Sequence, residues 1–242
     1  MRPHRILVIP ALALLFAALP HAARAQKIKT ENLPNFDLRP FHFGFALSYN
    51  TSDFFMTLKP TAPFTDSVLV IDHVKQPGFN LGIVSSFNMT PNLSLRFLPS
   101  LSFQERQLQY RFNRSVGKDA LYTKPVESTY LEFPLLLKLR SDRINNFAVY
   151  LLAGGKYSID MASKKDVNQA IDDEIVIKLT KTDYSVEVGG GVDMFLPYFK
   201  FGLELKMGIG LPNVLIDDNT RFSAPLESLR TKTYMLSFTF EG

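Results

Sequence analysis

Eight charged side chains fall at alternating positions in the most regular segments of this 242-residue chain. Small residues such as Gly, Ser, Ala and Asn share their face, and large aliphatic residues or Phe fill the opposite face. Carboxylates and ammonium groups placed together inside a protein either pair with one another or line a path for ions. The eight residues are Glu132, Lys138, Lys156, Glu187, Asp193, Lys200, Glu204 and Lys206.

Groups for other kinds of chemistry are scarce. The chain has no cysteine, and beyond residue 25 its only histidines are His42 and His73. A Ser–His hydrolase site needs a nucleophile, a base and an orienting carboxylate together, and no serine motif marks such a nucleophile. Gly189-Gly190-Gly191 has no Lys-Ser/Thr after it, so it does not indicate a phosphate loop. We therefore predict no enzymatic activity, no catalytic residue, no cofactor and no metal.

The first 25 residues are typical of a secretory signal peptide. Arg2 and Arg5 precede the apolar run 6–20, and Ala23-Arg24-Ala25 is a small-x-small cleavage site. The run is too short to span a bilayer comfortably. Removing this segment takes away three of the 27 basic residues and leaves 24 against 23 acidic ones. A balance so close to neutral predicts no nucleic-acid partner.

The remaining chain repeatedly alternates large apolar and small or polar residues with period two, which is typical of β-strands. Each segment has about the length that a tilted membrane strand needs. The predicted strands are 41–50, 79–89, 93–103, 129–139, 147–157, 184–196, 199–209 and 234–241. Short links at 90–92, 140–146 and 197–198 alternate with long connections at 51–78, 104–128, 158–183 and 210–233. Such alternation is typical of an up-and-down outer-membrane barrel with tight periplasmic turns.

The fold class predicted is therefore all-β: an eight-stranded antiparallel up-and-down transmembrane β-barrel of the outer-membrane type. Its parts are a signal peptide (1–25), a periplasmic N-terminal segment (26–40) and the barrel domain (41–242). A soluble barrel or sandwich is the alternative, but its solvated face would favour Thr, Lys and Glu over small residues. Pro99 and Pro134 fall inside strands, so we expect them close together at a local bulge.

In a barrel of eight strands the charged face points inward. One interpretation is a gated ion path, and the other is a buried charge network that fills the interior and fixes strand register. We favour the network because eight strands leave an interior just wide enough for side chains. Leu98, Leu136, Leu152 and Phe195 share this face and are expected to act as apolar filler.

The connections at 158–183 and 210–233 are longer than a hairpin needs and carry apolar residues. These either fold the loops over the barrel mouth or form a partner interface, so we take them as candidate partner-contacting residues. They are Ile171, Ile175, Ile177, Val214, Leu215, Ile216 and Leu226.

Five segments, in order, resemble the PorT family of outer-membrane barrels, called SprT in gliding bacteria. They are Tyr130-Leu131-Glu132-Phe133-Pro134-Leu135-Leu136-Leu137-Lys138, Ala162-Ser163-Lys164-Lys165, Glu187-Val188-Gly189-Gly190-Gly191-Val192-Asp193, Tyr198-Phe199-Lys200-Phe201 and Leu236-Ser237-Phe238-Thr239-Phe240-Glu241. The resemblance covers 130–241 and supplies no catalytic residues. It implies a role in protein secretion or assembly by the type IX secretion system of Bacteroidetes.

Two functions stay open at this point. The first is the non-enzymatic secretion accessory that the resemblance implies, and the second is a general surface barrel that binds envelope partners or stabilises the membrane. The expected location is the outer membrane. The expected partners are outer-membrane lipid, the barrel assembly machinery during insertion and, in the first case, other type IX components.

Overall fold

A computed structural model describes residues 31–59, 68–112, 120–162, 177–218, 220 and 222–242. The predicted signal peptide lies outside these residues. The strands are β1 (Phe41–Leu58), β2 (Val68–Asn88), β3 (Leu93–Phe97), β4 (Ser100–Phe112), β5 (Ala120–Arg140), β6 (Phe147–Asp160), β7 (Thr182–Phe195), β8 (Lys200–Gly210) and β9 (Leu226–Glu241). Among the described residues, no helix has the length and apolar character to cross a membrane.

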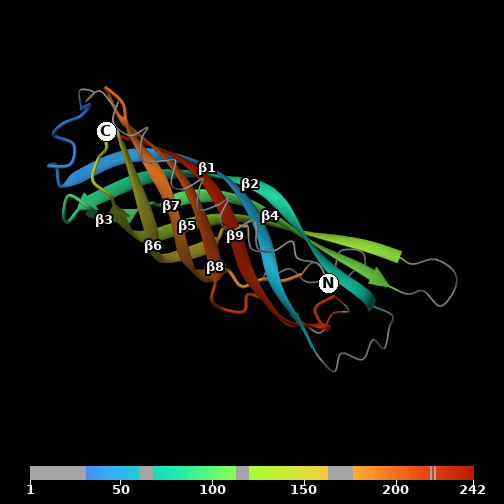
Figure 1. The fold of residues 1–242 in the computed structure, drawn as a ribbon. Helices are drawn as coiled ribbons and strands as arrows, with labels where there is room; N and C mark the ends of the chain where they lie inside the picture. The colour runs from blue at the N-terminus through green and yellow to red at the C-terminus, as the bar shows by residue number, and fades with distance from the viewer. Residues whose placement is uncertain (1–30, 60–67, 113–119, 163–176, 219, 221) are drawn as a thin grey trace, which may run out of the picture.

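The strands form one closed antiparallel ring, as Figure 1 shows. Apart from β3 and β4, strands that are neighbours in sequence pair with each other, and β1 closes the ring by pairing with both β2 and β9. The short β3 and β4 together make one strand of the wall, because both pair with β2 and with β5. The ring therefore has eight members, and the predicted fold class is confirmed.

Pro99 accounts for the division between β3 and β4. A proline has no N–H for the ladder, and the two strands stop on either side of Leu98-Pro99. The Leu98 N–H donates instead to the carbonyl oxygen of Pro134 at 3.1 Å, so the two prolines do lie together. The expected bulge is wrong: Phe97 pairs with Leu135 and Ser100 with Glu132, so no residue is inserted and the register continues.

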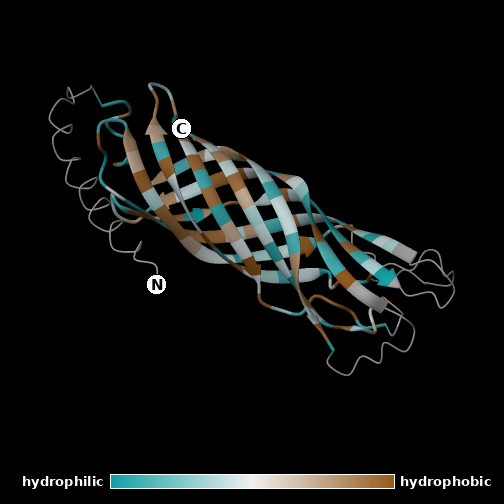
Figure 2. Ribbon diagram, turned by 45° about the vertical axis from the view of Figure 1, so that its right-hand side comes forward, coloured by the Kyte–Doolittle hydropathy of each residue, from teal (hydrophilic) through white to brown (hydrophobic). Residues whose placement is uncertain are grey.

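The two faces of the wall differ as the alternation requires. In Figure 2, hydrophobic and hydrophilic residues alternate along most strands. Outward side chains are large and apolar: Leu205 is 66% exposed and Ile83 61%. Aromatic residues border this belt, with Tyr49, Phe79, Tyr184 and Tyr234 towards the long connections and Phe41, Phe87, Phe97 and Phe147 towards the short turns. An apolar belt between aromatic girdles is the lipid-facing surface of a membrane barrel.

We call the two ends of the ring the turn end, where the short connections lie, and the loop end. Several strands run much further towards the loop end than the alternation predicted. The first long connection was predicted as 51–78, but β1 continues to Leu58 and β2 begins at Val68. Residues 104–112 and 120–128 likewise extend β4 and β5, and 226–233 extend β9. Figure 1 shows β2, β4 and β5 projecting beyond the other strands.

Candidate functional site

The eight charged residues predicted to face inward all lie inside the ring. Each is 7% exposed or less, and Asp193 and Glu204 are fully buried. The flanking strands supply them in alternation, because inward positions on β5, β6, β7 and β8 fall at every second residue. These eight positions follow the period-two alternation of the strands.

Near the turn end, an arginine joins two carboxylates. Both terminal nitrogens of Arg96 are used: Nη1 donates to Glu204 and Nη2 donates to Glu241 at 2.6 Å. Each carboxylate also has a lysine, since Lys200 donates to Glu241 at 2.8 Å and the Lys206 ammonium is 3.3 Å from Glu204. The result is a linear cluster that connects β3, β8 and β9.

A second pair stands beside it. Lys138 donates to both oxygens of Asp193, at 2.9 and 2.7 Å, and its ammonium lies 3.6 Å from the centroid of the Tyr150 ring. The Tyr150 hydroxyl in turn donates to Glu204 at 3.0 Å. Gly191 makes room for this ring, because a Cβ there would stand 2.6 Å from the tyrosine oxygen. Small residues on the inner face are thus required by the large side chains opposite.

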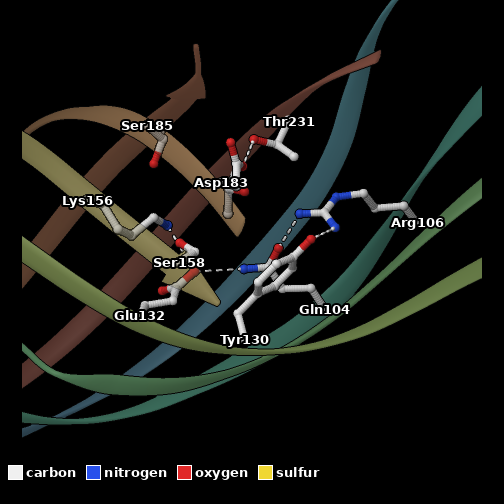
Figure 3. Close-up of a pocket in the computed structure, with 11 residues that line it drawn as sticks. Gln104, Arg106, Tyr130, Glu132, Lys156, Ser158, Asp183, Ser185 and Thr231 are labelled. Carbon is white, nitrogen blue, oxygen red and sulfur yellow. Dashed lines mark hydrogen bonds and ion pairs between the residues drawn. The ribbon is translucent and has the colours of Figure 1, made fainter. Parts of the chain in front are cut away.

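Nearer the loop end, Lys156 lies between two glutamates, 2.9 Å from Glu132 and 3.0 Å from Glu187. The amide of Gln104 also donates to Glu132, and Figure 3 shows Gln104, Glu132 and Lys156 converging from β4, β5 and β6. The cavity beside it measures about 10 Å³, and a second one further along measures about 20 Å³. Such volumes suit single water molecules.

Buried ion pairs are tolerable only when the charges balance and are hydrogen-bonded. In the described interior, the paired cations Arg96, Lys138, Lys156, Lys200 and Lys206 match the anions Glu132, Glu187, Asp193, Glu204 and Glu241 in number. Ala46, Val84, Leu98, Leu136, Tyr150 and Leu152 form an apolar cluster in the same space. The interior is thus occupied by side chains along this part of its length.

The loop end is covered by an apolar cluster that we call the lid core. It consists of Phe54, Ile71, Leu108, Tyr110, Val126, Ile177, Leu179, Val214, Phe222, Leu226 and Leu229. Tyr110 donates to the carbonyl oxygen of Phe222 at 3.0 Å, and the two rings meet edge to face. Apolar residues from the loops and the extended strands therefore close this mouth.

The lid core contains three of the candidate partner-contacting residues: Ile177, Val214 and Leu226 are at most 4% exposed. Leu215 packs against the cluster and Ile216 is half-buried. Ile171 and Ile175 lie outside the described residues. In the described residues, the loops are folded over the barrel mouth, as in the first of the two alternatives.

The turn end is closed by residues 31–40. Phe36 is 6% exposed and stacks on His42 with ring centroids 3.8 Å apart. The carboxylate of Asp37 binds Arg140 at 2.6 Å and Arg143 at 2.7 Å. Partial burial raises the pKa of Asp37, but the two arginines lower it by more, so the net pKa lies below the usual value. His42 is 1% exposed, on the inner face of β1.

The second histidine lies in a different place from the one predicted. His73 was assigned to the first long connection, but it belongs to β2, and its Nδ1 is 2.6 Å from Asp53. Among the described residues, no cluster of His, Asp or Glu could hold a metal ion.

Several buried residues of the interior are not among those predicted from the sequence. Arg96 and Glu241 stand on the same alternating face as the eight predicted residues, and that face was the signal that could have found them. Arg106 and Asp183, at 2% and 6% exposure, lie in segments that the sequence predicts to be loops, where the alternation is less regular.

The fold and its interior can now be compared with known proteins. The profile of a family described as "Outer membrane protein beta-barrel domain" matches residues 24–215. Ail, the attachment invasion locus protein of Yersinia pestis, is 13% identical, with 84% of this chain and 100% of that chain covered and a TM-score of 0.36. OprG from Pseudomonas aeruginosa is 11% identical, with coverages of 83% and 92% and a TM-score of 0.45. Neisserial surface protein A is 10% identical, with coverages of 82% and 95% and a TM-score of 0.40. No curated protein matches the chain.

Proposed function

The chain belongs to the outer membrane protein β-barrel domain family and lies in the outer membrane, and from this premise we propose that it is a non-enzymatic accessory of protein secretion or assembly by the type IX secretion system. The proposal starts from the five segments across 130–241 that resemble PorT and SprT proteins. It makes the barrel a surface for other secretion components rather than a conduit.

The filled interior is the observation that carries the proposal. In the part of the chain that the structure describes, five cations matched by five anions, an apolar cluster and cavities of about 10 and 20 Å³ occupy the interior between the mouths. The lid core covers one mouth and Phe36 stands in the other. A barrel closed in this way works through its outer surfaces, which favours a partner-binding role over transport.

Two exposed surfaces offer contact on opposite sides of the membrane. The turn end, which faces the periplasm, presents Leu38, Ile144 and Tyr198 at 78%, 70% and 89% exposure. The loop end presents Leu211 at 58% exposure and the half-buried Ile216. An exposed apolar side chain is common on protein surfaces, but a group of them at one end can form an interface.

The experiment is deletion of the gene, followed by an assay of proteins that carry type IX secretion signals. The proposal expects these proteins to be retained in the periplasm and the wild-type gene to restore their release. Unaffected secretion combined with a leaky envelope would instead support the alternative, a general barrel that stabilises the membrane.

Paired variants then identify the working side. Ile144→Ser/Tyr198→Ser alters the periplasmic surface, and Leu211→Ser/Ile216→Ser alters the loop end to a similar extent. Both should fold and migrate as barrels on unheated gels, because neither pair touches the charge network. Loss of secretion in one pair only assigns the partner surface to that side, and full secretion by both would contradict a partner surface at these residues.

A further inference from the structure

Two lysines share one aromatic ring on the outside of the barrel. The Lys232 ammonium on β9 is 5.0 Å from the centroid of Tyr234, and the Lys75 ammonium on β2 is 5.7 Å from the same centroid. Lys232 also stands 4.6 Å from the ring of Phe55 on β1. Cations over aromatic faces are stabilised, yet two like charges held at one ring also repel each other.

The site lies at the extracellular edge of the lipid belt. Tyr234 faces outward and pairs with Thr51, one step beyond the Tyr49–Leu236 pair of the belt. Lys232 precedes Tyr234 by two residues, which places it about 7 Å further towards the loop end. That position corresponds to the polar headgroup region that flanks the hydrocarbon core.

The lysines have no carboxylate partner among the described residues. Asp53 is the register partner of Lys232, but its Oδ1 is 2.6 Å from His73 Nδ1 and accepts the Phe54 N–H at 2.8 Å. Two residues along β9 from Lys232, the exposed Arg230 pairs in register with Phe55 and adds a third positive charge to this edge. The local excess of positive charge is therefore open to an anion from outside.

We propose that Lys75 and Lys232 bind a phosphate group of an outer-leaflet lipid headgroup, with Arg230 at the edge of the site. The phosphate sits between the two ammonium groups and neutralises both, and the acyl chains continue down the outer wall past Tyr234, Leu236 and Phe238. A lipid is the occupant because the site faces the bilayer and its aromatic floor leads directly into the apolar belt. Lysine binds phosphate as a compact point charge, so it needs no forked geometry.

Native mass spectrometry of the purified, folded full chain tests this. The protein in detergent is titrated with diphosphoryl lipid A, with the same lipid after removal of its phosphates, and with inorganic phosphate. The variant Lys75→Gln/Lys232→Gln removes both charges. As a charge-matched control, Lys59→Gln/Lys181→Gln removes two lysines elsewhere at the loop end, the half-buried Lys59, which pairs with Asp217, and the exposed Lys181. Lys75→Arg/Lys232→Arg keeps the charges and tests for rescue.

The wild type should bind diphosphoryl lipid A in preference to the dephosphorylated lipid and to inorganic phosphate. A lysine near an anionic membrane surface contributes roughly fivefold in affinity, so the double Gln variant should bind about thirtyfold more weakly. The control pair and the arginine pair should bind nearly as the wild type does. Equal binding by the double Gln variant, or an equal loss in the control pair, would overturn the site. Equal binding of inorganic phosphate would overturn the lipid assignment.

Discussion

Replacing Arg96 with methionine would show how much the interior network contributes to stability. The arginine is fully buried and serves two carboxylates, Glu204 and Glu241. Methionine has a similar length and no charge, so the change removes the interaction without opening a large cavity. Each carboxylate then keeps one lysine, at 3.3 Å for Glu204 and 2.8 Å for Glu241.

The magnitude follows from those contacts. A hydrogen bond to a charged group contributes about 1.5–3 kcal/mol, and two are lost. Breaking a buried ion pair from one side costs about 3–5 kcal/mol. The remaining lysines keep the cost within that range, so we expect Arg96→Met to lower the free energy of unfolding by about 3–5 kcal/mol. Adding Glu204→Gln restores the charge balance and should recover part of the loss, as a double-mutant cycle would reveal.

The assay is urea unfolding in lipid vesicles, followed by circular dichroism and by gel mobility without heating. Tryptophan fluorescence is not an option because the chain has no tryptophan. Arg111→Met is the control: Arg111 is an exposed arginine near the end of β4, and its loss should change stability by less than about 0.5 kcal/mol. If Arg96→Met unfolded at the same urea concentration as Arg111→Met, the charge network would fill the interior without contributing to the free energy of unfolding.

Three further predictions concern the wall, the turn end and the lid. Leu205→Lys places a charge in the middle of the lipid belt and should lower the free energy of unfolding by about 2–4 kcal/mol in vesicles; normal folding would show that this face is not in lipid. The lowered pKa of Asp37 means that its carboxylate stabilises the docking of residues 31–40 above the ordinary Asp pKa near 3.8, and that this contribution is lost as the pH falls through the lowered value. Protease cleavage near Asp37 should therefore increase at acid pH in the wild type, and Asp37→Asn should be cleaved readily at every pH. Phe222→Ala empties a fully buried position in the lid core and should cost about 3–5 kcal/mol locally, which faster hydrogen exchange at the loop end would report while the barrel still unfolds at the same urea concentration.

The membrane part of the fold could be predicted from the sequence because lipid and a narrow interior impose opposite demands on successive residues. At Leu203 to Lys206, for example, each residue is either apolar and outward or charged and inward. Beyond the aromatic girdle at the loop end, the difference between inward and outward residues is smaller, because both faces contact water or the lid core. Arg106, Leu108 and Tyr110 continue the inward face of β4, but the outward Gln107 and Gln109 no longer mark it as a membrane strand, and the segment was taken for a loop.

Pairwise contacts in the interior could not be predicted in the same way. The alternation places Lys138 and Asp193 inward, but only the register across β5, β6 and β7 brings them within 2.7 Å. Likewise Asp53, which lies beyond the predicted strand 41–50, contacts His73, just before β2 gains one residue relative to β4 between Lys75 and Phe79. Pro77 and Gly78 within that interval were the local signal for an irregularity.

The position of Glu241 in the chain has a consequence for assembly. It is the last residue of β9, the eighth strand of the wall, yet it binds Arg96, which is contributed by the third strand, and Lys200, which is contributed by the seventh. Until β9 takes its place, Arg96 lacks one of its two anions and Lys200 lacks the only carboxylate that pairs with it among the described residues. A partly formed barrel therefore keeps unpaired buried charges until β9 pairs with β1, and incomplete intermediates should be sparsely populated. Pairing of β9 completes the ring and its charge network. Removing even the last few residues of β9 should therefore impair insertion far more than their number suggests.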